Sequence, residues 1–119
     1  MYSVKVEAYF SSAHNLREYK GKCEELHGHN WKVELAVSRG KLDKAGMVAD
    51  FKKLKEKLNK VLDILDHKYL NNLDYFKKVN PTSENIAQYI YERLKNQITG
   101  ISSVTVWESE NTSATYYVK

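Results

Sequence analysis

Cysteine, proline and glycine are scarce in this sequence. Its 119 residues include one cysteine, one proline and five glycines. A single cysteine excludes an internal disulfide, so a fold of this size has to depend on a hydrophobic core. The low proline and glycine content also argues against a low-complexity chain. Because the cysteine has no partner and no charged, then apolar, leader is visible, we expect a cytoplasmic protein.

Long hydrophobic runs are missing as well. No apolar stretch approaches the roughly 18 residues that a membrane-spanning helix needs, so we expect no membrane partner. Hydrophobic residues nevertheless make up 42% of the chain and aromatic residues 12%. These fractions are typical of a globular protein, and the length fits one domain that covers residues 1–119.

The charge balance is basic, with a formal net charge of +4 and a pI near 9.0. This excess favours an anionic partner, which is a nucleic acid, an acidic membrane surface or a phosphorylated metabolite. Five lysines between positions 52 and 60 are interspersed with leucines at helical spacing. Such spacing is typical of a solvated helix face rather than of a nucleic-acid-binding stripe.

Strand-like alternation occurs near both ends of the chain. Residues 2–10 and 30–37 alternate apolar and polar side chains, and so do residues 104–108 and 114–118, which we expect to form a hairpin. A loop of about 15 residues joins the first two segments, and a loop of that length is usually functional. It carries Arg17, Lys20, Lys22, Cys23 and His27.

Helical periodicity occupies the middle of the chain. Apolar residues at spacings of three and four predict a helix over 51–65, with Asp50 as its N-cap. The segment 81–84, Pro-Thr-Ser-Glu, predicts a second helix start, whose apolar stripe extends to Ile98 and stops at Gly100. The element order is therefore β-β-α-α-β-β. We predict an α+β fold with a four-stranded antiparallel sheet and two helices on one face.

The stretch CEELHGHNW at 23–31 contains the chain's one thiol and two of its four imidazoles. Residues two apart on a strand point to the same side, so His27 and His29 can bind one ion. His14 shares the inward parity of the first strand and lies at its end. Three histidines with a vacant fourth position are the pattern of a catalytic zinc site, which we favour. The alternative is a closed structural site in which Cys23 is the fourth ligand.

Four further residues are candidates for proton transfer or binding. Cys23 lies among lysines, where its thiolate is favoured and can act as a base; a buried, inert cysteine is the alternative. Asp66 can orient His67 for proton transfer, although a histidine at a helix end also satisfies the last carbonyls. Glu108 lies on an apolar face, so it needs either a lysine partner or a ligand with two parallel N–H donors.

With these residues in view, the chain resembles the family of 6-pyruvoyl-tetrahydropterin and 6-carboxy-tetrahydropterin synthases from end to end. The motifs that carry the resemblance are AH at 13–14, C-x-x-x-HGH at 23–29, V-x-DF at 48–51, LDH at 65–67, NPTSEN at 80–85 and V-x-E at 106–108. The resemblance implies the tunnelling fold, in which subunits join their sheets into a barrel. Two trimers then stack into a homohexamer with active sites at subunit interfaces.

The resemblance also implies roles for the candidate residues. Zinc would be bound by His14, His27 and His29, Cys23 would be the general base, and Asp66 with His67 would be the second proton-transfer pair. The pterin would be bound by Glu108. Thr82 and Glu84 also match positions that line the pterin pocket, but helix capping explains these two residues equally well. The implied substrate is 7,8-dihydroneopterin triphosphate, with Arg17, Lys20 or Lys22 facing the phosphates.

Members of this family differ in the product that they release. One branch keeps a pyruvoyl side chain, another loses acetaldehyde to leave a 6-carboxyl group on the route to queuosine, and a third leaves a hydroxymethyl group. Leu26 stands where the third branch carries glutamate, and Cys23 is retained, so that branch is disfavoured. The short first loop favours the 6-carboxy branch over the pyruvoyl branch. A metal-binding domain without catalysis and a basic nucleic-acid binder are the rival classes.

Overall fold

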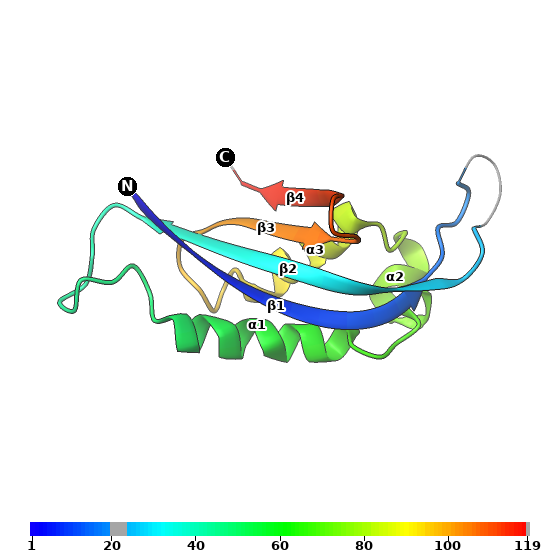
Figure 1. Ribbon diagram of the computed structural model, residues 1–119, viewed down its shortest axis with the longest axis horizontal. Coiled ribbons are helices and arrows are strands. Elements are labelled where there is room, and N and C mark those ends of the chain that lie inside the picture. Colours follow the sequence, from blue (N-terminus) through cyan, green and yellow to red (C-terminus); the bar gives the residue numbers. More distant parts are fainter. Residues whose placement is uncertain (20–23, 119) are drawn as a thin grey trace.

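Two long antiparallel strands form one half of the sheet in the computed structural model, which describes residues 1–19 and 24–118 (Figure 1). Strand β1 spans Tyr2–His14 and β2 spans His27–Arg39. They pair along their full length, with Tyr2 opposite Arg39 and His14 opposite His27. Both strands are longer than predicted because polar residues continue the alternation beyond the apolar segments. The connecting loop is therefore shorter than the sequence suggested.

The C-terminal hairpin completes the sheet. Strand β3 spans Ile101–Trp107 and pairs with β2, and β4 spans Ser113–Tyr117 and pairs with β3. The strand order is β1-β2-β3-β4, with every neighbour antiparallel. The predicted hairpin and four-stranded sheet are thus confirmed. Strands β1 and β4 are the two edge strands of this sheet.

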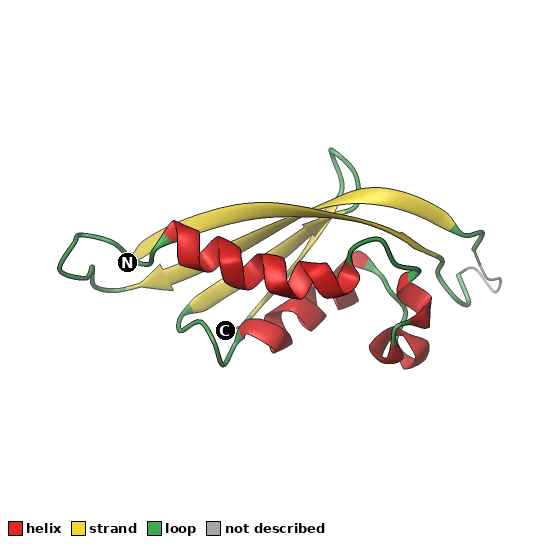
Figure 2. Cartoon of the chain, turned by 90° about the horizontal axis from the view of Figure 1, so that it is seen from below, coloured by secondary structure: helices red, strands yellow, loops and turns green. Residues whose placement is uncertain are grey.

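Both predicted helices lie on the same face of the sheet (Figure 2). Helix α1 spans Phe51–Leu65, as predicted, and the side chain of Asp50 caps it by accepting from the backbone N–H of Lys52. Helix α3 spans Ser83–Leu94 and is capped by Thr82. Helix α1 contacts β1, whereas α3 contacts β3 and β4. No helix in residues 1–19 and 24–118 has the length and apolar character to cross a membrane.

The prediction missed two short elements and placed one helix end wrongly. A 3-10 helix, η1, spans Leu70–Asn72, and helix α2 spans Asp74–Lys78. Neither is long enough to show a periodic apolar stripe. Helix α3 ends at Leu94, not near Ile98. Ile98 is nevertheless buried, because the chain turns back toward the sheet before Gly100, which has a positive φ of 85°.

The core lies between the sheet and the helices. Its side chains come mainly from the inward positions of the strands and from one stripe on each long helix, and the short elements η1 and α2 add Leu70 and Phe76. The largest fully buried members are Trp31, Phe76, Leu35, Leu58, Leu62, Leu65, Leu70, Ile86, Ile90 and Leu94. Inward strand positions continue this core up to the strand ends, so a polar side chain at an inward position there borders packed apolar groups.

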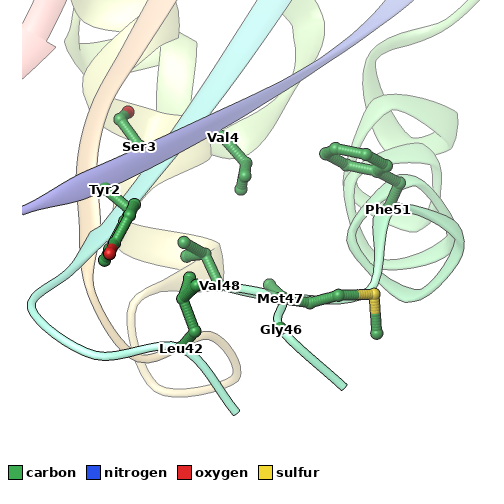
Figure 3. A pocket seen from close by; sticks show the side chains of 9 residues that line it. Tyr2, Ser3, Val4, Leu42, Gly46, Met47, Val48 and Phe51 are labelled. Carbon is green, nitrogen blue, oxygen red and sulfur yellow. The ribbon is translucent and has the colours of Figure 1, made fainter. Parts of the chain in front are cut away.

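An apolar pocket of about 350 Å³ lies at the end of the sheet where β1 begins (Figure 3). Its side chains are chiefly aliphatic and aromatic, and it has no histidine, acid or base. The lining residues are Tyr2, Ser3, Val4, Leu42, Gly46, Met47, Val48, Ala49 and Phe51. Among the described residues its polar side-chain groups are the hydroxyls of Tyr2 and Ser3, whereas imidazoles and a carboxylate gather at the opposite end of β1.

Candidate metal centre and active site

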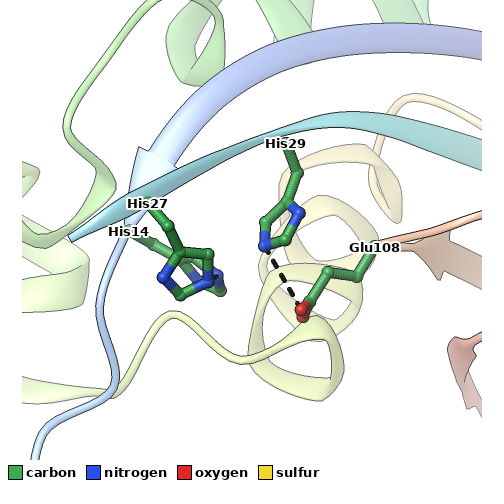
Figure 4. Close-up of side chains that lie close together, drawn as sticks. All are labelled: His14, His27, His29 and Glu108. Carbon is green, nitrogen blue, oxygen red and sulfur yellow. Dashed lines mark hydrogen bonds and ion pairs between the residues drawn. The ribbon is translucent and has the colours of Figure 1, made fainter. Parts of the chain in front are cut away.

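The ends of β1 and β2 bring three histidines together (Figure 4). His14 is the last residue of β1 and pairs with His27, the first residue of β2, while His29 follows on the same face. The ring centroids lie 4.7 Å (His14–His27), 5.2 Å (His14–His29) and 4.7 Å (His27–His29) apart. Glu108, just after β3, joins them, and one ligand atom from each of the four residues lies within 4.8 Å of the others.

Backbone carbonyls determine which nitrogen of two rings faces the centre of the cluster. Nδ1 of His14 lies 2.8 Å from the carbonyl of Pro81, and Nδ1 of His27 lies 2.8 Å from the carbonyl of Glu25. A carbonyl only accepts, so each Nδ1 donates and each neutral ring keeps its lone pair on Nε2. These two Nε2 atoms are 3.1 Å apart. Two lone pairs at that distance repel unless a proton or a cation lies between them.

His29 adds a third nitrogen that lacks a hydrogen bond. Its Nε2 is buried and has no hydrogen-bond partner among the described residues. Oε1 of Glu108 lies 3.2 Å away, close enough for an ion pair but not aligned as a hydrogen bond. Burial lowers the pKa of His29, Glu108 opposes this effect, and the two other imidazoles add to it. The neutral ring, which is the form that binds metals, is therefore favoured.

This donor set fits a divalent cation. Three imidazole nitrogens and one carboxylate oxygen match the ligands that zinc takes in proteins. A cation between them would relieve the repulsion between the Nε2 lone pairs of His14 and His27 and would give the buried Nε2 of His29 a partner. The sequence led us to expect three histidines and a vacant position. The structure places a carboxylate beside that position. Cys23, the fourth ligand of the alternative closed site, lies outside the described residues.

Outer contacts hold the metal-site side chains. Trp31 is fully buried, and its ring packs edge-on against His14 at 4.9 Å and against His29 at 5.1 Å. Ser83 donates from Oγ to Oε2 of Glu108 over 3.5 Å. Sequence reasoning did not single out Trp31 or Ser83 as site residues. Ser83 lies within the NPTSEN motif, but its contact with Glu108, 25 positions further along the chain, cannot be inferred from spacing.

Asp66 and His67 lie directly after α1 and contact each other. Oδ2 of Asp66 lies 2.8 Å from Nδ1 of His67, while its Oδ1 accepts from the backbone N–H of Ser11 at 2.8 Å. The Ser11 N–H, and then His67, lower the pKa of Asp66. An ionised Asp66 keeps the proton of His67 on Nδ1 and leaves Nε2 available for proton exchange. The side chain of His67 is 82% exposed.

His67 does not contact the metal cluster within the described part of one chain. A pocket of about 390 Å³ beside it is lined by His67, Lys68 and residues at the ends of β1 and β2. Those strand residues come from both faces of the sheet: Ser11, Ala13, Gly28 and Asn30 are at outward positions, whereas Ser12 and His29 are at inward positions. The turn that carries His67 is bonded to the backbone of β1, so His67 lies at the β1 edge of the sheet, whereas the three other histidines lie at inward positions of β1 and β2.

The two remaining predicted binding residues are at the start of α3. The hydroxyl of Thr82 accepts from the backbone N–H of Asn85 at 3.1 Å and thus serves as the N-cap. Glu84 is exposed in the first helical turn. This segment is adjacent to the metal cluster through the carbonyl of Pro81 and the hydroxyl of Ser83. The capping explanation holds for Thr82, and it leaves a binding role untested.

Two asparagines that sequence reasoning did not single out hold the chain directly after His14. The amide of Asn71 accepts from the N–H of Asn15 at 3.0 Å and donates to its carbonyl at 2.8 Å. The amide of Asn80 makes the same two bonds with Arg17, at 2.9 and 2.8 Å. The guanidinium of Arg17 donates to the carbonyl of Phe76. Arg17 is thus partly engaged, while Lys20 and Lys22 lie outside the described residues.

Comparison with known proteins identifies the family. The family model described as 6-pyruvoyl tetrahydropterin synthase matches residues 3–119. The chain is 40% identical to a putative 6-pyruvoyl tetrahydrobiopterin synthase of Caenorhabditis elegans, over 90% of this chain and 88% of the relative. It is 37% identical to the 6-carboxy-5,6,7,8-tetrahydropterin synthase of Synechocystis, over 98% and 94%.

A solved structure also resembles this one along nearly the whole chain. It is the 6-pyruvoyl tetrahydropterin synthase of Caenorhabditis elegans, with a TM-score of 0.85 and 30% identity over 99% of this chain and 96% of the other. This likeness confirms the predicted tunnelling fold. Sequence and fold agree, so the chain belongs to the 6-pyruvoyl tetrahydropterin synthase family.

Proposed function

We propose that this protein converts 7,8-dihydroneopterin triphosphate and one water molecule to 6-carboxy-5,6,7,8-tetrahydropterin, triphosphate and acetaldehyde. The observation that carries the proposal is the cluster of three imidazoles, two with their Nε2 lone pairs turned inward and a third with a buried, unpaired Nε2, next to one carboxylate. Such a cluster can hold zinc next to the side chain of a pterin substrate. Relatives named as 6-carboxy-tetrahydropterin synthases support this branch.

The proposed roles of the protein groups follow from their chemistry. Zinc bound by His14, His27 and His29 would polarise oxygens of the substrate side chain as a Lewis acid. The Cys23 thiolate removes a proton from one face of that side chain. His67, oriented by Asp66, exchanges a proton at the other face through Nε2. Each such transfer typically contributes ~10²–10⁴-fold to the rate.

Because His67 lies at the β1 edge of the sheet with its side chain exposed, we propose that a complete site forms between chains. This agrees with the homohexamer implied by the resemblance and with the two open strand edges, which need partners. A cytoplasmic location belongs to the same proposal. Sedimentation equilibrium tests the assembly, and a monomer mass at micromolar concentration would exclude the shared site.

The geometry allows two roles for Glu108, that of a pterin-binding residue and that of a metal ligand. We assign it to the pterin, because a carboxylate pairs well with two parallel N–H donors. Glu108→Gln should therefore raise the KM for substrate at least about tenfold, as expected for the loss of a charged hydrogen bond. Its zinc content, measured by metal analysis after dialysis, should stay at the wild-type level. Loss of zinc from Glu108→Gln would assign Glu108 to the metal instead.

Product analysis decides the branch. We expect incubation with 7,8-dihydroneopterin triphosphate to yield acetaldehyde and a carboxylated pterin, identified by mass spectrometry. The alternative is 6-pyruvoyl-tetrahydropterin without acetaldehyde, and the similarity to the Caenorhabditis elegans relative favours it. If the protein yields neither product, the two rival classes remain, a closed metal-binding domain and a basic nucleic-acid binder. The metal-binding domain also requires the fold to be lost when a chelator removes the metal.

A further inference from the structure

The buried hydroxyl of Ser12 bridges the two ends of the turn that contains Asp66 and His67. Ser12 lies on β1, two residues before His14, and is 7% exposed. Its Oγ donates to the carbonyl of Leu65, the last residue of α1. The same Oγ accepts from the backbone N–H of Lys68 at 3.0 Å. One hydroxyl therefore satisfies the backbone on both sides of the Asp66–His67 pair.

This turn has a conformation that needs support. His67 has a φ of 54°, in the left-handed region that residues other than glycine rarely adopt. Its exposed side chain has little packing that could enforce this conformation. The backbone of β1 gives part of the support, since the N–H of His67 donates to the carbonyl of Ser11 at 2.6 Å and the N–H of Ala13 donates to the carbonyl of Lys68 at 3.0 Å.

The backbone of Ser12 also contacts the metal side of the sheet. Its carbonyl accepts from the indole N–H of Trp31 at 3.2 Å. The ring of Trp31 packs edge-on against His14 and His29. Ser12 thus contacts the Asp66–His67 turn through its hydroxyl and the support of the metal ligands through its carbonyl. A shift at this residue would change the position of one group relative to the other.

We propose that Ser12 is a positioning residue whose hydroxyl holds His67 in its left-handed conformation and so sets where its imidazole is presented. An alanine at position 12 would leave the Leu65 carbonyl and the Lys68 N–H without this partner. The turn could then relax toward an ordinary backbone conformation and move the imidazole. The proposal rests on the proposed function for the role of His67 in proton transfer, but its structural part can be measured separately.

The test compares Ser12→Ala with a matched control, Ser102→Ala. Ser102 on β3 also has a hydroxyl that donates to a carbonyl, that of Ala36 at 3.2 Å, and accepts a second bond, from Ser38 at 3.1 Å. We expect Ser12→Ala to lower kcat about 10- to 100-fold, the scale of a small misplacement of a reacting group, with KM within twofold. Ser102→Ala should keep the wild-type kcat. Both should retain wild-type zinc.

Two NMR measurements report the turn itself. In Ser12→Ala the amide of Lys68 should exchange with solvent faster, and the coupling constant between the amide and α protons of His67, which depends on φ, should change. Ser12→Thr keeps the hydroxyl and should restore both values and kcat. If the alanine variant does not fold, Ser12→Cys takes its place, because a thiol has nearly the same shape but is a weak donor.

The outcomes separate this proposal from the proposed function. Unchanged amide exchange and coupling in the substituted protein would overturn the positioning role, whatever the activity. A disturbed turn with unchanged kcat would overturn it as well. If the wild-type protein has no turnover of the pterin, the proposed function fails. In that case a disturbed turn in Ser12→Ala, restored in Ser12→Thr, would still support the structural part.

Discussion

Replacing His27 with alanine should remove the metal and the activity together. His27 supplies one of the three inward nitrogens, and its Nε2 lies 3.1 Å from that of His14. Without this ligand two imidazoles remain, so the site should hold the ion much less tightly. We expect the affinity for zinc to fall by more than the roughly 10–100-fold that follows the loss of an outer contact alone. Turnover should fall to the background rate. Metal analysis after dialysis and a product assay measure the two losses.

The matched control for this experiment is His67→Ala. His67 is the one histidine that lies outside the metal cluster. Its substitution should lower turnover while zinc stays bound, because none of the three inward nitrogens is touched. A His27→Ala protein that keeps stoichiometric zinc would show that the cluster is not the metal site. Equal zinc loss in both variants would mean that the metal lies elsewhere or depends on the Asp66–His67 turn.

Replacing Cys23 with alanine should abolish turnover and leave zinc in place. Removing a general base typically costs ~10²–10⁴-fold in rate. Cys23 lies outside the described residues, but both ends of its loop are held. The N–H of Glu24 donates to the carbonyl of Leu16 at 2.8 Å, and Oε1 of Glu24 accepts from the N–H of Leu16 at 3.2 Å. We therefore expect loss of the thiol to leave the rest of the fold unchanged.

The same variant distinguishes the open zinc site from the closed one. If Cys23 is a permanent fourth ligand, Cys23→Ala should lose zinc affinity as His27→Ala does. If it is a base, the zinc content should equal that of the wild type while kcat falls. Cys23→Ser serves as the control for size, since a serine hydroxyl is a far weaker base at neutral pH than a thiolate. Normal turnover in either variant would remove Cys23 from the mechanism.

The parity of side chains along strands made part of the candidate site predictable. His14, His29 and Glu108 each continue the inward positions of a strand that was recognised from its alternation. Because strand side chains repeat every two residues, an inward position stays inward as far as the pairing continues. The observed pairing continues through His14 and His27. Alternation alone therefore assigns three distant residues to one side of the sheet.

Contacts between elements were not predictable in the same way. The carbonyl of Pro81 determines the tautomer of His14, and the hydroxyl of Ser83 reaches Glu108. Both depend on where the start of α3 packs against the ends of the strands. The asparagines that hold Asn15 and Arg17 are separated from them by 56 and 63 residues. No local pattern encodes a partner at that distance, because the bond depends on the packing of the whole domain.

Local periodicity and local hydrogen bonds were enough to predict the order of the strands and long helices, the caps at Asp50 and Thr82, and the inward direction of the strand histidines. That the inward nitrogens converge beside Glu108, and that His67 lies at the β1 edge of the sheet, could be read only from the folded chain. Both facts follow from the register of paired strands and the packing of helix ends against them, which are properties of the folded chain.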